Sequence, residues 1–461
     1  MESKSYRALA FDFDGTLFDT AELNYRSYKL AYYDLGIEID EQMFRKTIGL
    51  SVYEFNNAMG VNCDVNRLRE LKSKYYRDLS LYAKPNEYLL NVVRTSKLPK
   101  ALVTTSRLCN IEPLLNKYDL RKYFECIITQ EDVMRHKPNP DAYIKATQAM
   151  MIYPEDVLVF EDTRAGFVAA REAGCDCIQI KNFENDCVID VTGGSEAKTK
   201  ILFREDKLIV KKFAFGEEAS KRLKNQYDFL SKQNKYFVNV FDPIGNDNCF
   251  EYCMPYVIGV NLYEYQNKVK MLPIVMQKLN EASGTGYWNS KDVRSQIIER
   301  YIKPGIDVLK RCIRKDIPYP NLDETKVNLK DYLITNYHGD ATFENIIIQR
   351  DGNIVFIDPL PDRNIVTGLL QDFAKLGQSL YGYEAIKEHK YFDYTIERKI
   401  FEKEARKYLS EMEFKSLKVH IACMFFRRLK YQERQDASLV PIFGYIALNL
   451  IQEFNSGNYS F

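Results

Sequence analysis

Four short segments near the start of the chain carry side chains suited to phosphate chemistry. Asp12 and Asp14 are separated by one residue, and Gly15 follows them, so the chain can turn sharply after an apolar run. In such a pair one carboxylate can attack phosphorus while the other handles a proton. Thr104 ends a second apolar run, and Lys137 stands before a proline-rich segment. A hydroxyl and a cation of this kind can hold phosphoryl oxygens.

The elements that must position these groups are alternating strands and helices. The fourth segment is the acidic pair Glu161–Asp162, which ends an apolar run at 157–160. Alternation of this kind predicts an α/β fold with a Rossmann-like, doubly wound parallel sheet, in which ligands bind at the carboxyl ends of the strands. The helical stretch that follows the first strand predicts an inserted cap over about residues 20–95. The remaining predicted strands are 8–13, 101–105, 126–129 and 176–180, and the clearest helices are 140–150 and 165–173.

Over residues 7–182 these motifs resemble the haloacid dehalogenase superfamily, in particular its helical-cap, β-phosphoglucomutase-like subfamily. The resemblance implies that Asp12 is the nucleophile that becomes an aspartyl-phosphate. It implies that Asp14 protonates the leaving oxygen and then activates water, while its backbone carbonyl helps to hold Mg²⁺. By the same resemblance the magnesium ligands are Asp12, Asp14 and Asp162, and the phosphoryl-binding residues are Thr104, Thr105 and Lys137.

The resemblance leaves two reactions open, phosphate hydrolysis and phosphomutation. The related mutases carry a Lys just before a glycine of the cap loop and an Arg three residues after it. In this chain Gly49 is preceded by Ile48, and Val52 follows three residues later. This departure favours hydrolysis.

A second set of polar residues lies in the last third of the chain. Asp340 and Asn345 are five residues apart in a loop that leads into a predicted hairpin at 346–349 and 354–357, and Asp358 ends that hairpin. The three side chains can therefore converge. Transfer of a phosphoryl group from ATP needs a carboxylate that orients and deprotonates a hydroxyl, and oxygen ligands for Mg²⁺.

This segment resembles the aminoglycoside phosphotransferase and choline kinase group, which has a protein-kinase-like fold. The resemblance implies that Asp340 is the catalytic base and that Asn345 and Asp358 hold Mg²⁺. We interpret His338 as a brace of the loop and Asp372 as structural. A looser resemblance to kinase domains of bacterial surface-polysaccharide genes suggests a sugar or polyol substrate.

The residues upstream fit the small lobe of such a kinase. Lys211 resembles the strand lysine that reaches the ATP phosphates, with Lys212 as the competing choice, since strand alternation sends only one of them inward. Gly193 and Gly194 could form the turn that covers the nucleotide. Gln226 occupies the place of the expected Glu partner. The ion pair is therefore either moved to another residue or replaced by a hydrogen bond.

Composition and length predict two domains and exclude several classes of protein. We expect a phosphatase domain at 1–182, a linker at 183–195 and a kinase-like domain at 196–461, whose lobes meet near residue 258. The 65 basic and 64 acidic residues leave no net charge to attract nucleic acid. No apolar run reaches the roughly 18 residues that span a membrane. The start of the chain does not resemble a signal peptide and the ten cysteines are scattered, which predicts a cytoplasmic protein. The sequence does not indicate an oligomeric state.

Together the two sets of motifs predict a bifunctional enzyme that uses Mg²⁺ and ATP. It would hydrolyse a phosphomonoester and phosphorylate a small-molecule hydroxyl, with a phosphorylated sugar or polyol as substrate, in the synthesis of surface carbohydrate precursors. The alternative is a phosphatase or phosphomutase joined to a kinase-like domain that senses nucleotide without catalysis.

Overall fold

The computed structural model divides into two compact units, one that ends at Lys212 and one that covers Phe213–Phe461. The division falls inside one strand and therefore lies later in the chain than the predicted linker at 183–195. The structure describes residues 4–46, 56–57, 60–181, 183, 186–191, 197–232, 235–284, 287–289, 297–322, 332–334, 337–360 and 368–461.

A parallel sheet of five strands forms the centre of the N-terminal unit, in the order β5-β4-β1-β6-β7. Its middle strand, β1 (Ala8–Phe11), pairs in parallel with β4 and β6, and each of these pairs in parallel with an outer strand. The predicted parallel sheet with interspersed helices is thereby confirmed. The other strands are β4 (Lys100–Val103), β5 (Cys126–Ile128), β6 (Val157–Glu161) and β7 (Asp176–Gln179).

Small residues of the sheet allow two helices to pack closely on one of its faces. Ala8 and Ala10 of β1 belong to a buried cluster with residues of α7 (Asp141–Met150) and α8 (Arg164–Glu172). On the other face the ring of Phe11 stacks on that of Phe160, with centroids 4.8 Å apart. Two more helices, α5 (Glu87–Thr95) and α6 (Leu108–Lys117), belong to the same unit.

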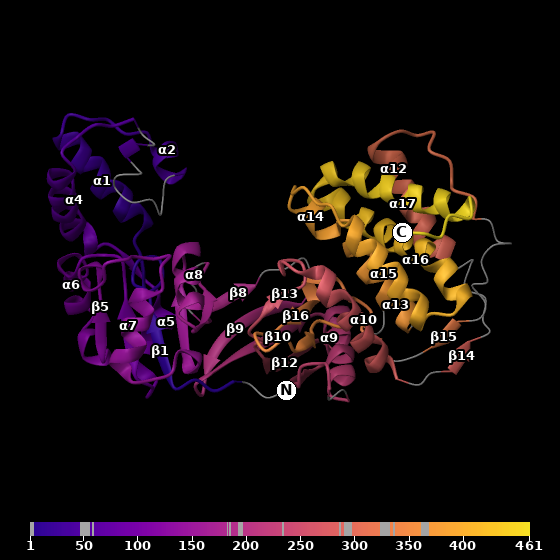
Figure 1. Cartoon of the computed structure of the whole chain (residues 1–461), viewed down its shortest axis with the longest axis horizontal. Helices are drawn as coiled ribbons and strands as arrows, with labels where there is room; N and C mark the ends of the chain where they lie inside the picture. Colours follow the sequence, from indigo (N-terminus) through magenta and orange to yellow (C-terminus); the bar gives the residue numbers. More distant parts are fainter. Residues whose placement is uncertain are drawn as a thin grey trace. The chain divides into compact units, whose positions relative to one another are not determined.

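The helical cap is the group of helices that Figure 1 draws apart from the sheet: α1 (Ala21–Asp34), α2 (Glu41–Lys46) and α4 (Val65–Ser80). It has a hydrophobic core of its own, in which Tyr25, Tyr32 and Leu68 are buried. A short antiparallel pair, β2 (Phe18–Asp19) with β3 (Lys84–Pro85), closes the excursion. The cap thus ends at Lys84–Pro85, earlier than the expected residue 95.

A strand pair later in the chain packs against the parallel sheet, and its first strand belongs to the same unit. It consists of β9 (Lys198–Arg204) and β10 (Lys207–Phe215), which lie in a second five-stranded sheet of order β11-β12-β10-β9-β8. Phe203 of β9 meets the ring of Phe160 edge-on, with centroids 6.0 Å apart. The Tyr88 hydroxyl donates to Phe203 O at 3.2 Å and accepts from Phe203 N at 3.0 Å. The other strands of this sheet are β8 (Ile189–Val191), β11 (Phe241–Asn246) and β12 (Cys249–Pro255).

The C-terminal unit is mostly helical and contains the predicted hairpin. Strands β16 (Ile346–Ile348) and β17 (Ile354–Phe356) pair antiparallel, and β13 (Val260–Asn261) extends the sheet. The remaining helices are α9 (Glu217–Leu230), α10 (Lys268–Ser283), α12 (Lys303–Cys312), α13 (Leu369–Leu380), α14 (Tyr383–Lys387), α15 (Thr395–Tyr408), α16 (Glu411–Gln435) and α17 (Val440–Asn455), with strands β14 (Tyr287–Asn289) and β15 (Tyr332–Ile334).

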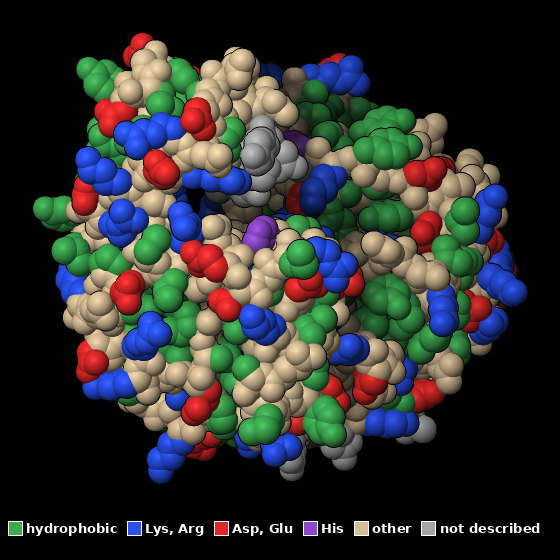
Figure 2. Space-filling view, turned by 60° about the vertical axis from the view of Figure 1, so that its left-hand side comes forward, with side chains coloured by type: hydrophobic (Ala, Val, Ile, Leu, Met, Phe, Trp, Pro, Cys, Tyr) green, Lys and Arg blue, Asp and Glu red, His purple; other side chains and the backbone are tan. Residues whose placement is uncertain are grey.

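The surface charge on one face and the hydropathy of the helices can be described directly. On the face drawn in Figure 2, basic and acidic side chains are interspersed. One helical stretch among the described residues, Ala437–Asn455, is long and apolar enough to cross a membrane. Core helices pass the same test, and Phe443, Ala447 and Phe454 of α17 are fully buried inside the protein.

Candidate active sites

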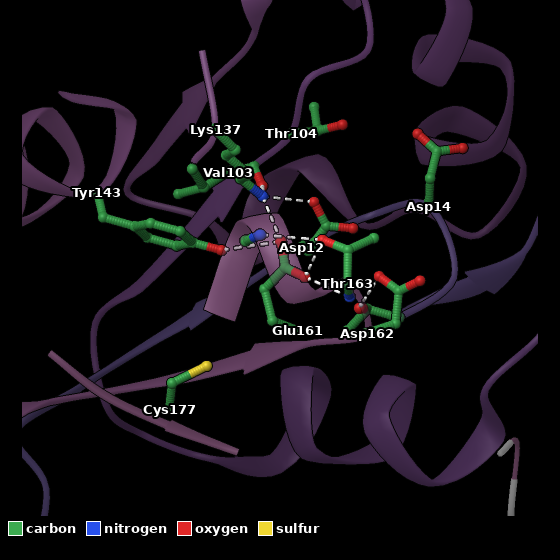
Figure 3. Close-up of polar contacts among 12 residues, drawn as sticks. Asp12, Asp14, Val103, Thr104, Lys137, Tyr143, Glu161, Asp162, Thr163 and Cys177 are labelled. Carbon is green, nitrogen blue, oxygen red and sulfur yellow. Dashed lines mark hydrogen bonds and ion pairs between the residues drawn. The ribbon is translucent and has the colours of Figure 1, made fainter. Parts of the chain in front are cut away.

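Lys137 lies at the centre of the N-terminal site, between carboxylates from two neighbouring strands (Figure 3). Its Nζ is 2.7 Å from Asp12 Oδ1 and 2.7 Å from Glu161 Oε1, and it donates to Val103 O at 2.9 Å. The Lys137 side chain is only 4% exposed. Burial lowers the pKa of Lys137, but the two carboxylates outweigh it and raise the pKa, so the ammonium group stays charged. The ends of β1, β4 and β6 therefore meet at this one cation.

Asp162 approaches the turn after β1 because that turn contains a glycine. Gly15 has a φ of +80°, and a Cβ added there would lie 2.1 Å from Asp162 Oδ2. Thr16 Oγ1 also donates to Asp162 Oδ1 at 3.3 Å. The two acidic segments that the sequence predicts to converge, Asp12–Asp14 and Asp162, are therefore neighbours.

The crowding of these acids fits a divalent cation. Burial raises the pKa of Asp12 well above its usual range, and Glu161 and Asp162 add to the rise against the opposing effect of Lys137. Burial, together with Glu161 and Asp14, raises the pKa of Asp162 to about 7. A bound cation would relieve this repulsion. Within the described ranges no three His, Cys, Asp or Glu side chains cluster as metal ligands.

Asp14 lies apart from Lys137 in Figure 3, and two hydroxyl groups hold its carboxylate. Ser106 Oγ donates to Asp14 Oδ2 at 2.6 Å, and Tyr76 of cap helix α4 donates to Asp14 Oδ1. Lys72, one turn earlier in α4, lies 4.4 Å from the centroid of the Tyr76 ring. Burial lowers the pKa of Lys72 to about 8, although Asp14 opposes the shift. A carboxylate at the boundary of cap and sheet is well placed to exchange protons with a ligand between them.

The two threonines that follow β4 differ in their surroundings. Thr104 is buried, and its Oγ1 accepts a hydrogen bond from Ser106 N at 3.0 Å. In Figure 3 Thr104 lies beside Lys137 and Asp12. Thr105, by contrast, is exposed. The position of Thr104 suits phosphoryl binding better than that of Thr105.

Comparison with known proteins places this site in a family. Residues 9–180 match the family model described as haloacid dehalogenase-like hydrolase. Fructose-1-phosphate phosphatase of Escherichia coli is 30% identical over 185 residues, which are 38% of this chain and 97% of that protein. Through residues 9–180, the chain belongs to the haloacid dehalogenase-like hydrolases.

Other relatives of the hydrolase domain also have names from phosphate chemistry. A phosphorylated carbohydrates phosphatase of Thermotoga maritima is 27% identical and covers 37% of this chain and 83% of its own length. The crystal structure of β-phosphoglucomutase from Clostridium difficile is 26% identical, covers 39% of this chain and 86% of that chain, and has a TM-score of 0.33.

Sequence reasoning missed three residues of the hydrolase site. Ser106 could have been suspected, because it continues the hydroxyl run after β4. Tyr76 is one of many cap tyrosines and gave no signal of its contact with Asp14. Tyr143 of α7 donates to Glu161 Oε1 at 3.4 Å, and its ring lies 4.9 Å from Lys137 Nζ. Its position became visible only once α7 was packed on the sheet.

The second candidate site centres on an ion pair in the C-terminal unit. Lys375 Nζ of α13 lies 2.9 Å from Asp340 Oδ1, and the Lys375 side chain is 7% exposed. Burial alone raises the pKa of Asp340, but Lys375 outweighs it and the net pKa is lowered. Asp340 is therefore ionised, as a base must be. The sequence analysis did not single out Lys375.

Asn345 and the segment of Asp358 adjoin Asp340. Asn345 Nδ2 donates to Asp340 O at 2.8 Å and to Asp340 Oδ2 at 3.2 Å. Ile357 N donates to Asn345 O at 3.0 Å, so the residue before Asp358 is bonded to Asn345. Asp358 has a φ of +56°, a conformation that marks a sharp turn at the end of β17.

His338 and Asp372 brace this loop, as the sequence suggested. Asp340 N donates to His338 Nδ1 at 3.1 Å, so the other ring nitrogen carries the proton and donates to Ile357 O at 2.7 Å. Burial lowers the pKa of His338 to about 4, which keeps the ring neutral. The Asp372 carboxylate accepts from His338 N at 2.8 Å and from Gly339 N at 2.7 Å. The loop is therefore held from both sides.

Gln226 of α9 connects by hydrogen bonds to the segment that follows β17 and to Tyr252 of β12. Its Nε2 donates to Pro359 O at 2.8 Å, and its Oε1 accepts from the buried Tyr252 hydroxyl at 2.6 Å. Glu218, an alternative partner residue, is exposed and pairs with Arg222. These hydrogen bonds join Gln226 to Pro359 and Tyr252, and the partner of the strand lysine stays a prediction.

The prediction that Lys211 is the lysine of β10 that points inward was wrong. Lys212 is buried, with 7% exposure, whereas Lys211 is half-buried, because alternation along β10 sends Lys212 inward together with Leu208 and Val210. Gly193 and Gly194 lie outside the described residues, as do Ile48 and Val52 of the cap loop.

Proposed function

We propose that residues 9–180 are a Mg²⁺-dependent phosphatase that hydrolyses the phosphomonoester of a sugar or polyol. The observation that carries this proposal is the position of Lys137, which joins the Asp12 and Glu161 carboxylates at the ends of adjacent parallel strands. The names of the relatives, a fructose-1-phosphate phosphatase and a phosphorylated carbohydrates phosphatase, support the substrate class.

In this mechanism Asp12 is the nucleophile and Asp14 is the general acid and base. An Asp12 oxygen attacks phosphorus, the bond from phosphorus to the ester oxygen breaks, and Asp14 gives that oxygen a proton. Asp14 then takes a proton from water, whose oxygen attacks the aspartyl-phosphate and releases phosphate and Asp12. Lys137 and Thr104 bind phosphoryl oxygens. Bound Mg²⁺, held by Asp12, Asp162 and the Asp14 carbonyl, would neutralise the charge of the phosphate.

Release of inorganic phosphate from a panel of sugar and polyol phosphates tests this activity. We expect release that requires Mg²⁺, stops with EDTA, and falls by roughly three orders of magnitude or more in Asp12→Asn. Asp119→Asn, at an exposed residue with φ of +53°, is the control. Unchanged activity in Asp12→Asn would rule the mechanism out. The alternative, a phosphomutase, predicts a labelled bisphosphate intermediate and an isomerised product.

We further propose that the C-terminal unit is a bilobal, kinase-like domain that phosphorylates a small-molecule hydroxyl with ATP. The Asp340–Lys375 ion pair and the hydrogen bonds from Asn345 to Asp340 support this proposal. Asp340 would take the proton of the acceptor hydroxyl as its oxygen attacks the γ-phosphorus and the bond to ADP breaks. Asn345 and Asp358 would hold Mg²⁺.

The competing proposal for this unit is a nucleotide sensor without catalysis, and Asp340→Asn separates the two. A kinase predicts ADP formation that depends on an acceptor and is lost in Asp340→Asn. A sensor predicts ATP binding, measured by calorimetry, with no turnover in either protein. The strand lysine that contacts ATP is now better sought at Lys212, with Lys211 as the matched comparison.

Both activities in one chain are useful if they act at different positions of one molecule. The kinase would add a phosphate at one hydroxyl, and the phosphatase would remove another, leaving a product ready for nucleotide activation in surface carbohydrate synthesis. The protein is incubated with ATP, Mg²⁺ and phosphosugars, and ³¹P NMR follows the products. The order in which the products appear tests the order of the two steps. The cytoplasmic location stays a prediction.

A further inference from the structure

A cluster of cationic side chains adjoins Asp340, and we define it as the basic cluster: Lys375 of α13 with Arg427 and Arg428 of α16. Helices α13 and α16 pack against each other. Lys375 Nζ contacts Asp340 Oδ1 at 2.9 Å and Gln378 Oε1 at 3.3 Å. The charges of Arg427 and Arg428 both act to lower the pKa of Lys375, which burial already lowers. The cluster therefore concentrates positive charge beside the proposed base.

Arg428 is held in place by aromatic rings. Its guanidinium carbon lies 5.4 Å from the centroid of the Tyr383 ring and 5.4 Å from that of Tyr431. Lys387 Nζ lies 4.9 Å from the Tyr383 centroid. Stacking on aromatic rings fixes a planar guanidinium group without using its N–H donors, which remain available for an anion.

Two buried N–H donors beside this cluster lack acceptors among the described residues. They are Arg428 Nε and Gln378 Nε2. Gln378 is fully buried, and its Oε1 already accepts from Lys375. A buried donor without an acceptor costs free energy that a ligand oxygen can recover. These donors therefore indicate a ligand rich in acceptor oxygens.

Two of the described acids near the cluster are paired with lysines. Asp340 is paired with Lys375, and Glu344 lies 3.2 Å from Lys387 Nζ. Burial raises the pKa of Glu384 to about 7, so this carboxyl is partly protonated near neutral pH. A cationic acceptor would meet unfavourable charges here, whereas an anionic one would be attracted.

We propose that the hydroxyl acceptor of the C-terminal unit already carries a phosphate group, which the basic cluster binds. This inference rests on the proposed kinase activity and narrows its substrate to sugar or polyol phosphates. Arg428 supplies a fork of donors that matches phosphate oxygens. Asp340 then faces the hydroxyl group of the same molecule.

The experiment uses the full-length protein with Asp12→Asn, so that the phosphatase does not consume the acceptor. ADP formation and ³¹P NMR compare sugar phosphates with the unphosphorylated sugars and with sugar acids. We expect kcat/KM to be at least about tenfold higher for the phosphates than for the unphosphorylated sugars, since charged hydrogen bonds are the stronger ones. The sugar acids show whether a carboxylate can replace the phosphate.

Substitutions of Arg428 test the residue itself. Arg428→Gln is expected to raise KM for the sugar phosphate by roughly tenfold or more and to leave KM for ATP unchanged, and Arg428→Lys to restore part of the affinity. Lys430→Gln, at an exposed position two residues away, is the control. If Arg428→Gln does not fold, Arg428→Lys and the acceptor panel still decide.

Three outcomes would overturn the inference. Equal kcat/KM for phosphorylated and unphosphorylated sugars would show that the acceptor need not be anionic. A change in KM for ATP alone in Arg428→Gln would assign the arginine to the nucleotide. In both cases the kinase activity itself survives. If none of the acceptors in the panel supports ADP formation, the proposed kinase activity falls together with this inference.

Discussion

At the scale of single residues, the N-terminal site depends on one buried cation among several acids. Lys137 offsets the charges of Asp12 and Glu161, and the three side chains come from segments far apart in the sequence. The motifs predicted this convergence, because parallel strands place their carboxyl ends at one edge. They could not predict the hydroxyl groups that hold Asp14, because the contact with Tyr76 depends on where the cap lies.

Lys137→Met should destabilise the N-terminal unit as well as abolish phosphate release. Without the ammonium group the Asp12 and Glu161 carboxylates stay buried without a charge partner, a loss of about 3–5 kcal/mol in the free energy of unfolding. Urea denaturation followed by circular dichroism measures it. Lys145→Met, which removes an exposed ion pair with Asp132, should cost less than about 1 kcal/mol. Similar losses in both variants would contradict the central position of Lys137.

Gly15→Ala should weaken the use of Mg²⁺ more than it weakens the fold. A methyl group there displaces the Asp162 carboxylate, whereas Gly36, with a similar φ of +74°, has open space around it. Gly36→Ala therefore carries the backbone strain alone. We expect the Mg²⁺ concentration for half-maximal phosphate release to rise by roughly tenfold in Gly15→Ala only, since ligand geometry sets metal affinity. An equal rise in both variants would assign the effect to strain.

At the scale of elements, strand alternation and helix periodicity predicted most of the chain. The five parallel strands and the β16–β17 hairpin lie close to their predicted limits. The error is local, because the side of β10 that faces inward was misjudged. The pairing partners of the strand decide that side, and the segment alone does not reveal it.

The contact of β9 with the parallel sheet can be tested by two substitutions. Phe203→Ala removes a ring that packs on Phe160 and should cost about 3–5 kcal/mol of unfolding free energy in the N-terminal unit. Tyr88→Phe removes only the hydroxyl that bonds to the Phe203 backbone and should cost about 1–2 kcal/mol. Thermal denaturation measures both. Equal stability of Phe203→Ala and the unsubstituted protein would show that β9 does not support this unit.

At the scale of the whole molecule, the chain divides into two compact units after Lys212, and the predicted domain limits stay a prediction. A polar, glycine-containing segment such as 183–195 is typical of linkers, yet β9 and the first part of β10 group with the N-terminal unit. Composition describes solvation, whereas the packing of Phe203 on Phe160 is a property of the folded chain.

The C-terminal unit should lose stability in mild acid through His420. Burial lowers the pKa of this histidine to about 4, below its unfolded value of 6.5. The contribution of neutral His420 to the free energy of unfolding is fully present above pH 6.5 and is lost as the pH falls towards 4. The loss is about 2 kcal/mol at pH 5. Urea denaturation at pH 7 and pH 5, followed by fluorescence of Trp288, should show this slope. His420→Leu should reduce the loss of unfolding free energy between pH 7 and pH 5 by about 2 kcal/mol, and His389→Leu, on the surface, should not. An unchanged slope in His420→Leu would assign the acid sensitivity to other groups.

The strand pair β9–β10 has a practical consequence for anyone who separates the two halves. A fragment that stops at residue 195 would uncover the ring of Phe160 and leave the Tyr88 hydroxyl without its backbone partners. A fragment that begins at residue 213 would start in the middle of β10. Neither cut yields two intact pieces, so the halves of this chain are better silenced one at a time by point substitution than expressed apart.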